Sequence, residues 1–188
     1  MKIGITGSIA SGKSEVTKFL KEQGFSTYDA DAISKELTLK NNICYQKIID
    51  TFGIEILDES LEINRKKLGE VVFNDFEKKE ILENIIHPHV IKEIDNINDN
   101  LSFVEVPLLF EAKLEYLFDK IIVVSCDYEV ELTRLMKRNN FSKEEAIKRI
   151  NSQMDIKIKE KKADYIIYNN GDIESLHEKI RYILKGII

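Results

Sequence analysis

The chain has little of what marks a secreted, metal-binding or membrane protein. Its two cysteines, Cys44 and Cys126, lie far apart and match no metal-binding or redox spacing, so free thiols in a reducing compartment are the simpler interpretation. No apolar run approaches the length of a transmembrane helix. Met1 and Lys2 lead directly into a predicted strand, which leaves no room for a signal peptide. We therefore expect a cytoplasmic protein with no membrane partner.

Proline is also scarce, with two residues in 188, and no low-complexity linker or internal repeat divides the chain. A chain of this length can bury a proper core, and its 43% hydrophobic content is ordinary for a globular protein. The formal net charge of −5 argues against a nucleic-acid partner. We expect a single domain, 1–188, whose insertions are helical. No long apolar stripe remains once the core is assigned, which favours a monomer.

The most specific motif is a phosphate-binding loop, because residues 7 to 14 read GSIASGKS and match G-x-x-x-x-G-K-[ST] in full. An apolar strand pattern precedes the loop and a helical pattern follows it, as the motif requires. Glycines let backbone N–H groups face one anion, and the helix N-terminus adds partial positive charge. Lys13 would reach the β- and γ-phosphates of a nucleotide, and the Ser14 hydroxyl would bind Mg²⁺. The predicted nucleotide contacts are Gly7, Ala10, Ser11, Gly12, Lys13, Ser14 and the backbone of Glu15.

Short strand patterns alternate with helical ones along the chain. Several of the strand segments are apolar on both faces, as buried parallel strands are. This alternation is typical of a parallel α/β sheet. The predicted strands are residues 3–6, 25–28, 102–106, 121–125 and 165–168.

A long, mainly helical block separates the second and third predicted strands. It is too long for a simple crossover and predicts an inserted helical subdomain, residues 36–100, a natural place for a second substrate. Pro88 disfavours helix at His87, so we expect the helix there to be interrupted. The core would then comprise residues 1–35, 101–133 and 163–188.

Basic residues concentrate between Arg134 and Lys162, where ten Lys/Arg stand against four Asp/Glu. A solvated helix face explains most of the lysines. Arg134 and Arg138 are four residues apart and share one helix face, and guanidinium groups match phosphate oxygens in a bidentate manner. We expect residues 134–162 to form a lid over ATP, with Arg149 also directed at a substrate.

A general base is predicted at the end of the second strand, which reads Asp29-Ala30-Asp31. In a parallel sheet the carboxyl ends of the strands line the ligand crevice, so Asp31 is placed to accept a hydroxyl proton. One of the two aspartates could instead cap the following helix.

The segment 106–111 reads VPLLFE, an apolar trio between a proline and an acid. It could be an ordinary strand end with core side chains. It could also be a crevice wall, with Leu108, Leu109 and Phe110 contacting an acceptor. Glu111, or less favourably Glu105, could act there through Mg²⁺ and water.

Taken together, these segments resemble the dephospho-CoA kinase family over nearly the whole chain. The phosphate loop alone is shared by many kinases, whereas the Asp-Ala-Asp, His-Pro and Val-Pro-Leu-Leu-Phe-Glu motifs in this order are far more specific. The matching segments are residues 5–14, 28–31, 64–68, 72–73, 87–88, 106–111, 163–165 and 169–171, with Arg134, Arg138, Arg149 and Gln153.

The resemblance implies a three-layer P-loop kinase fold with a central five-stranded parallel sheet, a helical CoA-binding insert and a helical lid. It implies transfer of the ATP γ-phosphate, with Mg²⁺, to the ribose 3′-hydroxyl of dephospho-CoA, with Asp31 as base and Arg138 in the lid. Further implied substrate contacts are Arg65, His87 and Pro88 in the insert, Leu109 and Phe110 near the acceptor, and Asn170 and Gly171 near the adenine.

The loop departs from the family pattern, since Ser8 and Ala10 stand where glycines are usual and Glu15 stands where threonine is common. Two alternatives remain at this point. One is another small-molecule or nucleoside monophosphate kinase of the same fold. The other is a nucleotide-dependent switch, because residues 50–53 match D-x-x-G, although they follow a helical pattern and the chain has no N-K-x-D guanine-binding motif.

Overall fold

The computed structural model describes residues 1–73 and 75–188. In this part of the chain, contacts group the residues into two compact units, one of residues 1–29 and 98–188 and the other of residues 30–97. The predicted insert, 36–100, differs from the second unit by a few residues at each end. The functional division into core, insert and lid stays a prediction.

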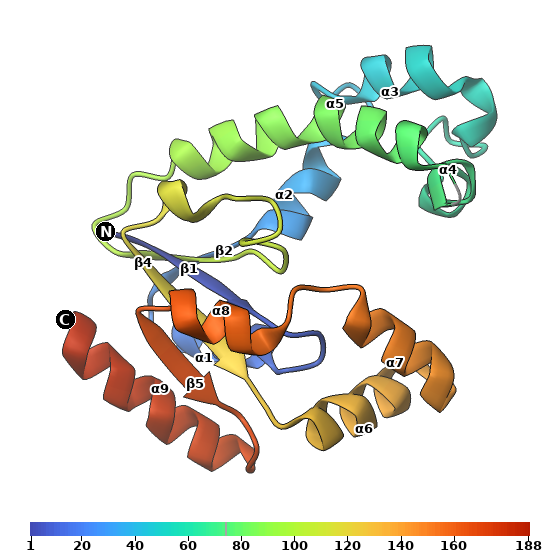
Figure 1. Ribbon diagram of the computed structural model, residues 1–188. Coiled ribbons are helices and arrows are strands. Elements are labelled where there is room, and N and C mark those ends of the chain that lie inside the picture. The colour runs from blue at the N-terminus through green and yellow to red at the C-terminus, as the bar shows by residue number, and fades with distance from the viewer. Residues whose placement is uncertain (74) are drawn as a thin grey trace. The chain divides into compact units, whose positions relative to one another are not determined.

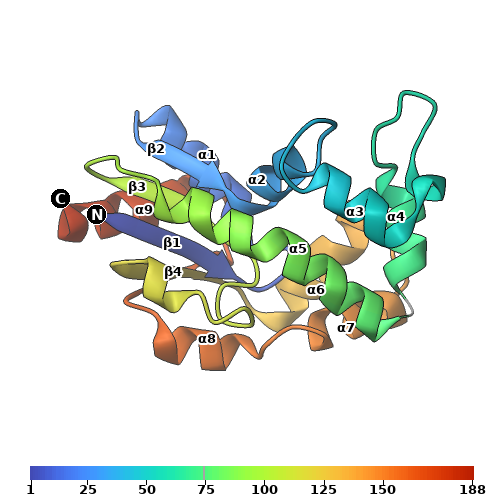
Figure 2. The same cartoon turned by 90° about the horizontal axis from the view of Figure 1, so that it is seen from above.

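The first unit is built on a parallel sheet, as predicted. Among the described residues, five strands pair in the order β2-β3-β1-β4-β5, and every pairing is parallel. Figure 2 shows β2, β3, β1 and β4 side by side. The strands are β1 (Lys2–Gly7), β2 (Ser26–Asp29), β3 (Ser102–Glu105), β4 (Lys120–Ser125) and β5 (Tyr165–Tyr168). All five predicted strands are confirmed, with ends that differ by one residue or less.

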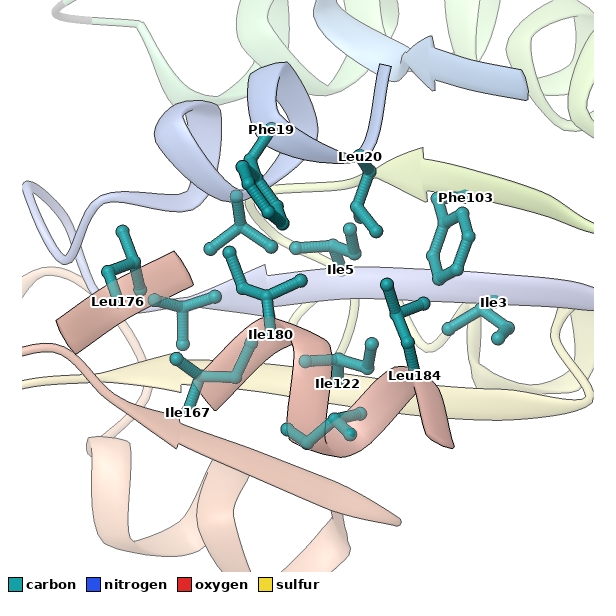
Figure 3. Close-up of a cluster of buried hydrophobic side chains, with 13 residues drawn as sticks. Ile3, Ile5, Phe19, Leu20, Phe103, Ile122, Ile167, Leu176, Ile180 and Leu184 are labelled. Atoms are coloured by element: carbon teal, nitrogen blue, oxygen red, sulfur yellow. The ribbon is translucent and has the colours of Figure 1, made fainter. Parts of the chain in front are cut away.

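Helices α1 (Lys13–Glu22) and α9 (Ile173–Ile187) bury one face of this sheet. Figure 3 shows their apolar side chains, among them Leu20 and Ile180, meeting Ile5 and Ile122 of the strands. Side chains alternate between faces along a strand, so the neighbouring buried residue Val123 belongs to the opposite face. Helix α8 (Ile156–Lys162) packs on β4 (Figure 1), and the three layers of the predicted fold are confirmed.

Two further helices, α6 (Tyr128–Asn139) and α7 (Lys143–Asn151), pack together through a small apolar cluster that includes Leu135 and Ala146. Ser142 begins α7 with a capping box, in which its hydroxyl accepts from the Glu145 N–H and the Glu145 carboxylate accepts from the Ser142 N–H. A short 3₁₀ turn, η2 (Glu115–Leu117), precedes β4. None of the described helices is both long enough and apolar enough to cross a membrane.

The second unit is helical. Its longest helix, α5, packs against α2, α3 and α4 (Figure 1), and its buried face includes Ile85, Val90 and Ile94. The elements are α2 (Ala30–Leu37), α3 (Tyr45–Phe52), η1 (Ile54–Ile56), α4 (Arg65–Phe73) and α5 (Phe76–Asp95). The D-x-x-G match at residues 50–53 is the last turn of α3 followed by Gly53, so it does not have the strand-to-loop context of a switch.

The expectation that Pro88 interrupts the helix at His87 is wrong, because α5 runs through both residues without a break. Proline removes one backbone donor and costs about 3 kcal/mol in a helix interior. Buried side chains on both sides of it, Ile85 before and Val90 and Ile94 after, each contribute roughly 1.5–3 kcal/mol. Their packing outweighs the lost hydrogen bond and keeps the helix continuous.

Candidate active site

The phosphate loop joins β1 to α1, and its glycines are required by close contacts. A Cβ on Gly7 would lie 2.0 Å from the Val124 carbonyl oxygen, and one on Gly12 would lie 2.3 Å from Nδ2 of Asn169. Gly12 also has φ +98° and begins α1 without a side-chain cap. The first N–H groups of that helix therefore remain available to an anion.

Ala10 adopts the left-handed conformation, with φ +56°. This conformation costs a residue with a Cβ about 1–2 kcal/mol relative to glycine. The family preference for glycine here thus has a backbone reason. Ala10 therefore stores a small amount of backbone strain.

Lys13 lies buried beneath the loop. Its ammonium donates to the Ser8 carbonyl at 2.8 Å and to the Gly7 carbonyl at 3.4 Å. Burial lowers the pKa of Lys13 to about 8, opposed by the carboxylate of Glu105 and reinforced by the ammonium of Lys159. Contact of this ammonium with the phosphates of a nucleotide stays a prediction.

Ser14 is held by a carboxylate from the end of β3. Its hydroxyl donates to Oε1 of Glu105 at 3.1 Å, and the Thr17 hydroxyl donates to Oε2 of the same residue at 2.9 Å. A hydroxyl beside a buried carboxylate is a set of hard oxygen donors, which fits Mg²⁺ bound mainly by phosphates and water. Glu105, the less favoured of two acids in the sequence, is therefore the one that lies at Ser14.

The turn after β5 lies against the phosphate loop. Asn169 is buried, and its side-chain Nδ2 donates to the Ser11 carbonyl at 2.8 Å. The main-chain carbonyl of Asn169 accepts from Nη1 of Arg134 at 2.9 Å. Oδ1 of Asn170 accepts from the Asp127 N–H at 2.7 Å. The structure thus brings Arg134 and the predicted Asn170-Gly171 turn to one side of the loop. Asn169 was matched to the family segment 169–171 but not named as a site residue, although it follows a strand end at the same edge of the sheet as the loop.

The other two predicted arginines lie on exposed positions. Arg138 donates from Nε to Oδ1 of Asn139, and its charge is one of those that lower the pKa of Lys13. The guanidinium of Arg149 stacks over the Phe141 ring, 5.2 Å from its centroid. Contact of either guanidinium with a substrate stays a prediction.

The segment after β3 is mostly packed inside the protein. Leu109 and Phe110 are buried, Leu109 against Gly4, whereas Leu108 is 48% exposed. Oε1 of Glu111 accepts from Nζ of Lys159 at 2.7 Å. This packing matches the core interpretation of Leu109 and Phe110, and their contact with an acceptor stays a prediction.

A cavity of about 470 Å³ opens beside the phosphate loop. It lies between the ends of β4 and β5 and the linker from α7 to α8, and its walls include Ser8, Glu131, Gln153 and Tyr168. Burial raises the pKa of the Glu131 carboxyl. None of the predicted nucleotide contacts lines this cavity.

The second unit carries four predicted site residues. Asp31 lies in the first turn of α2, two residues beyond Asp29. Arg65 begins α4 and donates from Nη2 to the Thr38 hydroxyl at 2.8 Å. His87 and Pro88 lie on the exposed part of α5.

Comparison with known proteins gives a consistent result. A family model described as dephospho-CoA kinase matches residues 1–175. The chain is 47% identical over 190 residues to the dephospho-CoA kinase of Carboxydothermus hydrogenoformans, covering 97% of this chain and 92% of the relative. It is also 47% identical over 191 residues to that of Fusobacterium nucleatum, covering 100% of this chain and 98% of the relative.

A solved structure agrees with these matches. The dephospho-CoA kinase from Campylobacter jejuni aligns with a TM-score of 0.68 and 35% identity, over 99% of this chain and 96% of that chain. Both the resemblance predicted from the sequence and the kinase fold are confirmed. The chain belongs to the dephospho-CoA kinase family, ATP-dependent kinases that phosphorylate a hydroxyl of dephospho-CoA.

Proposed function

We propose that this protein transfers the γ-phosphate of ATP to the ribose 3′-hydroxyl of dephospho-CoA, giving CoA and ADP. The observation that carries the proposal is the group of side chains around the phosphate loop. Lys13 lies under the loop, and Ser14 contacts Glu105 at the end of β3. A cation and a hydroxyl–carboxylate pair at one loop suit a nucleotide triphosphate and its metal. Membership of the dephospho-CoA kinase family supports dephospho-CoA as the acceptor of the phosphate.

The acceptor oxygen must lose a proton as it attacks the γ-phosphorus in line with the leaving group. We propose that the Asp31 carboxylate takes this proton, while the bond from the γ-phosphorus to the bridging oxygen breaks and ADP leaves. The register pairs Asp29 with Glu105, so the chain enters α2 from the strand end next to the Ser14 contact. Asp31 follows two residues later.

Lys13 and Arg138 would stabilise the negative charge on the transferred phosphoryl group, since both are cations. The charge of Arg138 also contributes to the lowered pKa of Lys13. Ser14 and Glu105 would hold Mg²⁺, which when bound neutralises charge on the phosphates. The proposed nucleotide contacts remain the loop from Gly7 to Glu15 with Arg134, Asn170 and Gly171. The proposed acceptor contacts remain Arg65, His87, Pro88, Leu109, Phe110, Glu111 and Arg149.

We further propose that residues 36–100 bind the CoA portion and that residues 134–162 close over ATP to exclude water. Free water at the γ-phosphate would turn transfer into hydrolysis. The protein would act in the cytoplasm, and two buried free thiols, Cys44 and Cys126, support a reducing compartment. We also propose that it is a monomer that acts on these two small molecules, without a nucleic-acid or membrane partner.

The test is the Asp31→Asn variant, with Asp29→Asn as the matched control. Asparagine keeps the shape of the side chain and cannot accept the proton. We expect kcat to fall by at least about 100-fold while the affinity for ATP stays within about twofold. The control should lose much less activity. Equal losses in both variants, or full activity in Asp31→Asn, would show that the aspartates cap α2 and that neither is the base.

A further inference from the structure

Lys159 is a buried cation for which the proposed transfer gives no role. It lies in α8, none of its side chain is exposed, and its Nζ is 2.7 Å from Oε1 of Glu111. Buried ion pairs are often no more stabilising than apolar side chains of the same volume. Folding alone therefore gives little reason for a lysine at this position.

The position of Lys159 is fixed by a set of contacts. Oε1 of Glu111 also accepts from the Met154 N–H at 3.1 Å. One carboxylate therefore binds both the segment just before α8 and the ammonium of Lys159 within that helix. One residue earlier, Oε1 of Gln153 accepts from the Ile9 N–H at 3.1 Å. The segment from Gln153 to Lys159 is thereby tied to both the phosphate loop and Glu111.

Two ammonium groups share one carbonyl of the phosphate loop. Nζ of Lys159 lies 3.5 Å from the Gly7 oxygen, and Nζ of Lys13 lies 3.4 Å from the same atom. Lys13 also donates to the Ser8 carbonyl at 2.8 Å. In this arrangement Lys13 is folded back on its own loop, and it must leave these carbonyls to reach the phosphates of a nucleotide.

We propose that Lys159 is a positioning residue for Lys13. Its ammonium, fixed by Glu111, repels that of Lys13 away from the loop carbonyls toward the nucleotide and stays beside the Gly7 carbonyl itself. The proposal rests on the proposed function, in which Lys13 contacts the transferred phosphate. A second ammonium beside the same buried carbonyl repels the ammonium of Lys13 and weakens its hydrogen bonds to the neutral carbonyls of the loop.

The charged groups around Lys13 come from three elements. They are Glu105 of β3, Glu131 and Arg138 of α6, and Lys159 of α8. Of these groups, Lys159 is the one whose ammonium lies beside the same loop carbonyl as that of Lys13. Removing Lys159 therefore removes a repulsive charge from this carbonyl and lets Lys13 stay on it.

The test compares Lys159→Met with Lys159→Arg and with Lys185→Met, an exposed position in α9 outside the segment 134–162. Two quantities are measured for each variant at one pH, kcat with ATP and dephospho-CoA and the affinity for a non-hydrolysable ATP analogue. Lys159→Met should lower kcat by roughly 10- to 100-fold and weaken binding of the analogue by about fivefold or more. Lys159→Arg should keep the wild-type affinity and most of kcat, and Lys185→Met should change neither.

Two results would overturn the proposal. Lys159→Met could keep the wild-type kcat and analogue affinity, or Lys159→Arg could weaken analogue binding as far as Lys159→Met, which would assign the effect to packing. If Lys159→Met does not fold, the double variant Lys159→Met/Glu111→Gln removes both charges and is measured against the same two outcomes. Analogue binding needs no acceptor, so weakened analogue binding in Lys159→Met, in a protein that does not phosphorylate dephospho-CoA, would reject the proposed acceptor and keep the role of Lys159.

Discussion

At the scale of single residues, the buried ammonium of Lys13 makes nucleotide binding depend on pH. Its pKa is lowered to about 8, chiefly by burial. Below pH 8 the free protein already carries the charge, so the affinity for ATP should be constant. Above pH 8 ATP must bind together with a proton, because phosphate oxygens favour the ammonium form. The affinity should then fall by up to about tenfold per pH unit.

Calorimetry in buffers of different ionisation enthalpy would measure this proton uptake between pH 7 and pH 9. A non-hydrolysable ATP analogue avoids turnover during the titration. The control is Lys13→Met, which should bind the analogue more weakly and without proton uptake in this range. Wild-type binding with no proton uptake above pH 8 would contradict the lowered pKa.

The strand, loop and helix around residues 7 to 14 could be predicted, because the motif requires this order, and β1 and α1 flank the loop as expected. Lys13 donates to the Ser8 carbonyl and Ser14 to Glu105, and contact of either residue with a nucleotide or a metal stays a prediction. The choice between Glu105 and Glu111 could not be made, because it depends on which strand end pairs beside β1. Register places Glu105 opposite Ile5, and only the folded sheet shows this.

Other residues were missed because their role depends on tertiary contacts. Lys159 looks like one more lysine in a basic helix, and nothing in the spacing of residues 156–162 sets it apart. Only its complete burial against Glu111 does so. Asn169 had a usable signal, since it follows the predicted strand 165–168 directly.

At the scale of elements, the proline inside α5 predicts a gain in stability on its removal. Pro88→Ala restores an N–H that can donate to the carbonyl of Asn84, four residues earlier, so the free energy of unfolding should rise by about 1–3 kcal/mol. Urea denaturation measures the change. Lys92→Ala, an exposed change in the same helix, should alter it by less than about 0.5 kcal/mol.

The same variant tests the His87-Pro88 site. If this part of α5 binds the acceptor, Pro88→Ala should raise the KM for dephospho-CoA and leave the KM for ATP unchanged. A less stable Pro88→Ala protein would contradict the cost assigned to the proline. Unchanged kinetics for both substrates would remove Pro88 from the proposed site.

Helices were harder to predict than strands in this chain. Strands of four to six residues with β-branched side chains stand out between helical patterns, and all five were found. The continuity of α5 could not be predicted, because the local preference of Pro88 is overruled by burial of Ile85, Val90 and Ile94. A helix end predicted from one proline is therefore wrong where buried side chains on both sides of that proline pack strongly.

At the scale of the whole molecule, the proposed roles all belong to one reaction, transfer of a phosphate from ATP to dephospho-CoA. The loop, the strand-end acids and the basic helices would fit several small-molecule kinases of this fold. The family motifs and relatives that match over nearly the whole chain identify the acceptor. The identity of the acceptor is therefore a property of the whole chain, and no single residue decides it.

The most direct measurement is a turnover assay with ATP, Mg²⁺ and a panel of acceptors, in which ADP and the phosphorylated product are both quantified. Dephospho-CoA should give CoA and ADP in equal amounts. AMP, CMP and water alone should be used at least about 100-fold more slowly. Faster phosphorylation of a nucleoside monophosphate than of dephospho-CoA, or ADP release without CoA, would contradict dephospho-CoA as the acceptor of this protein.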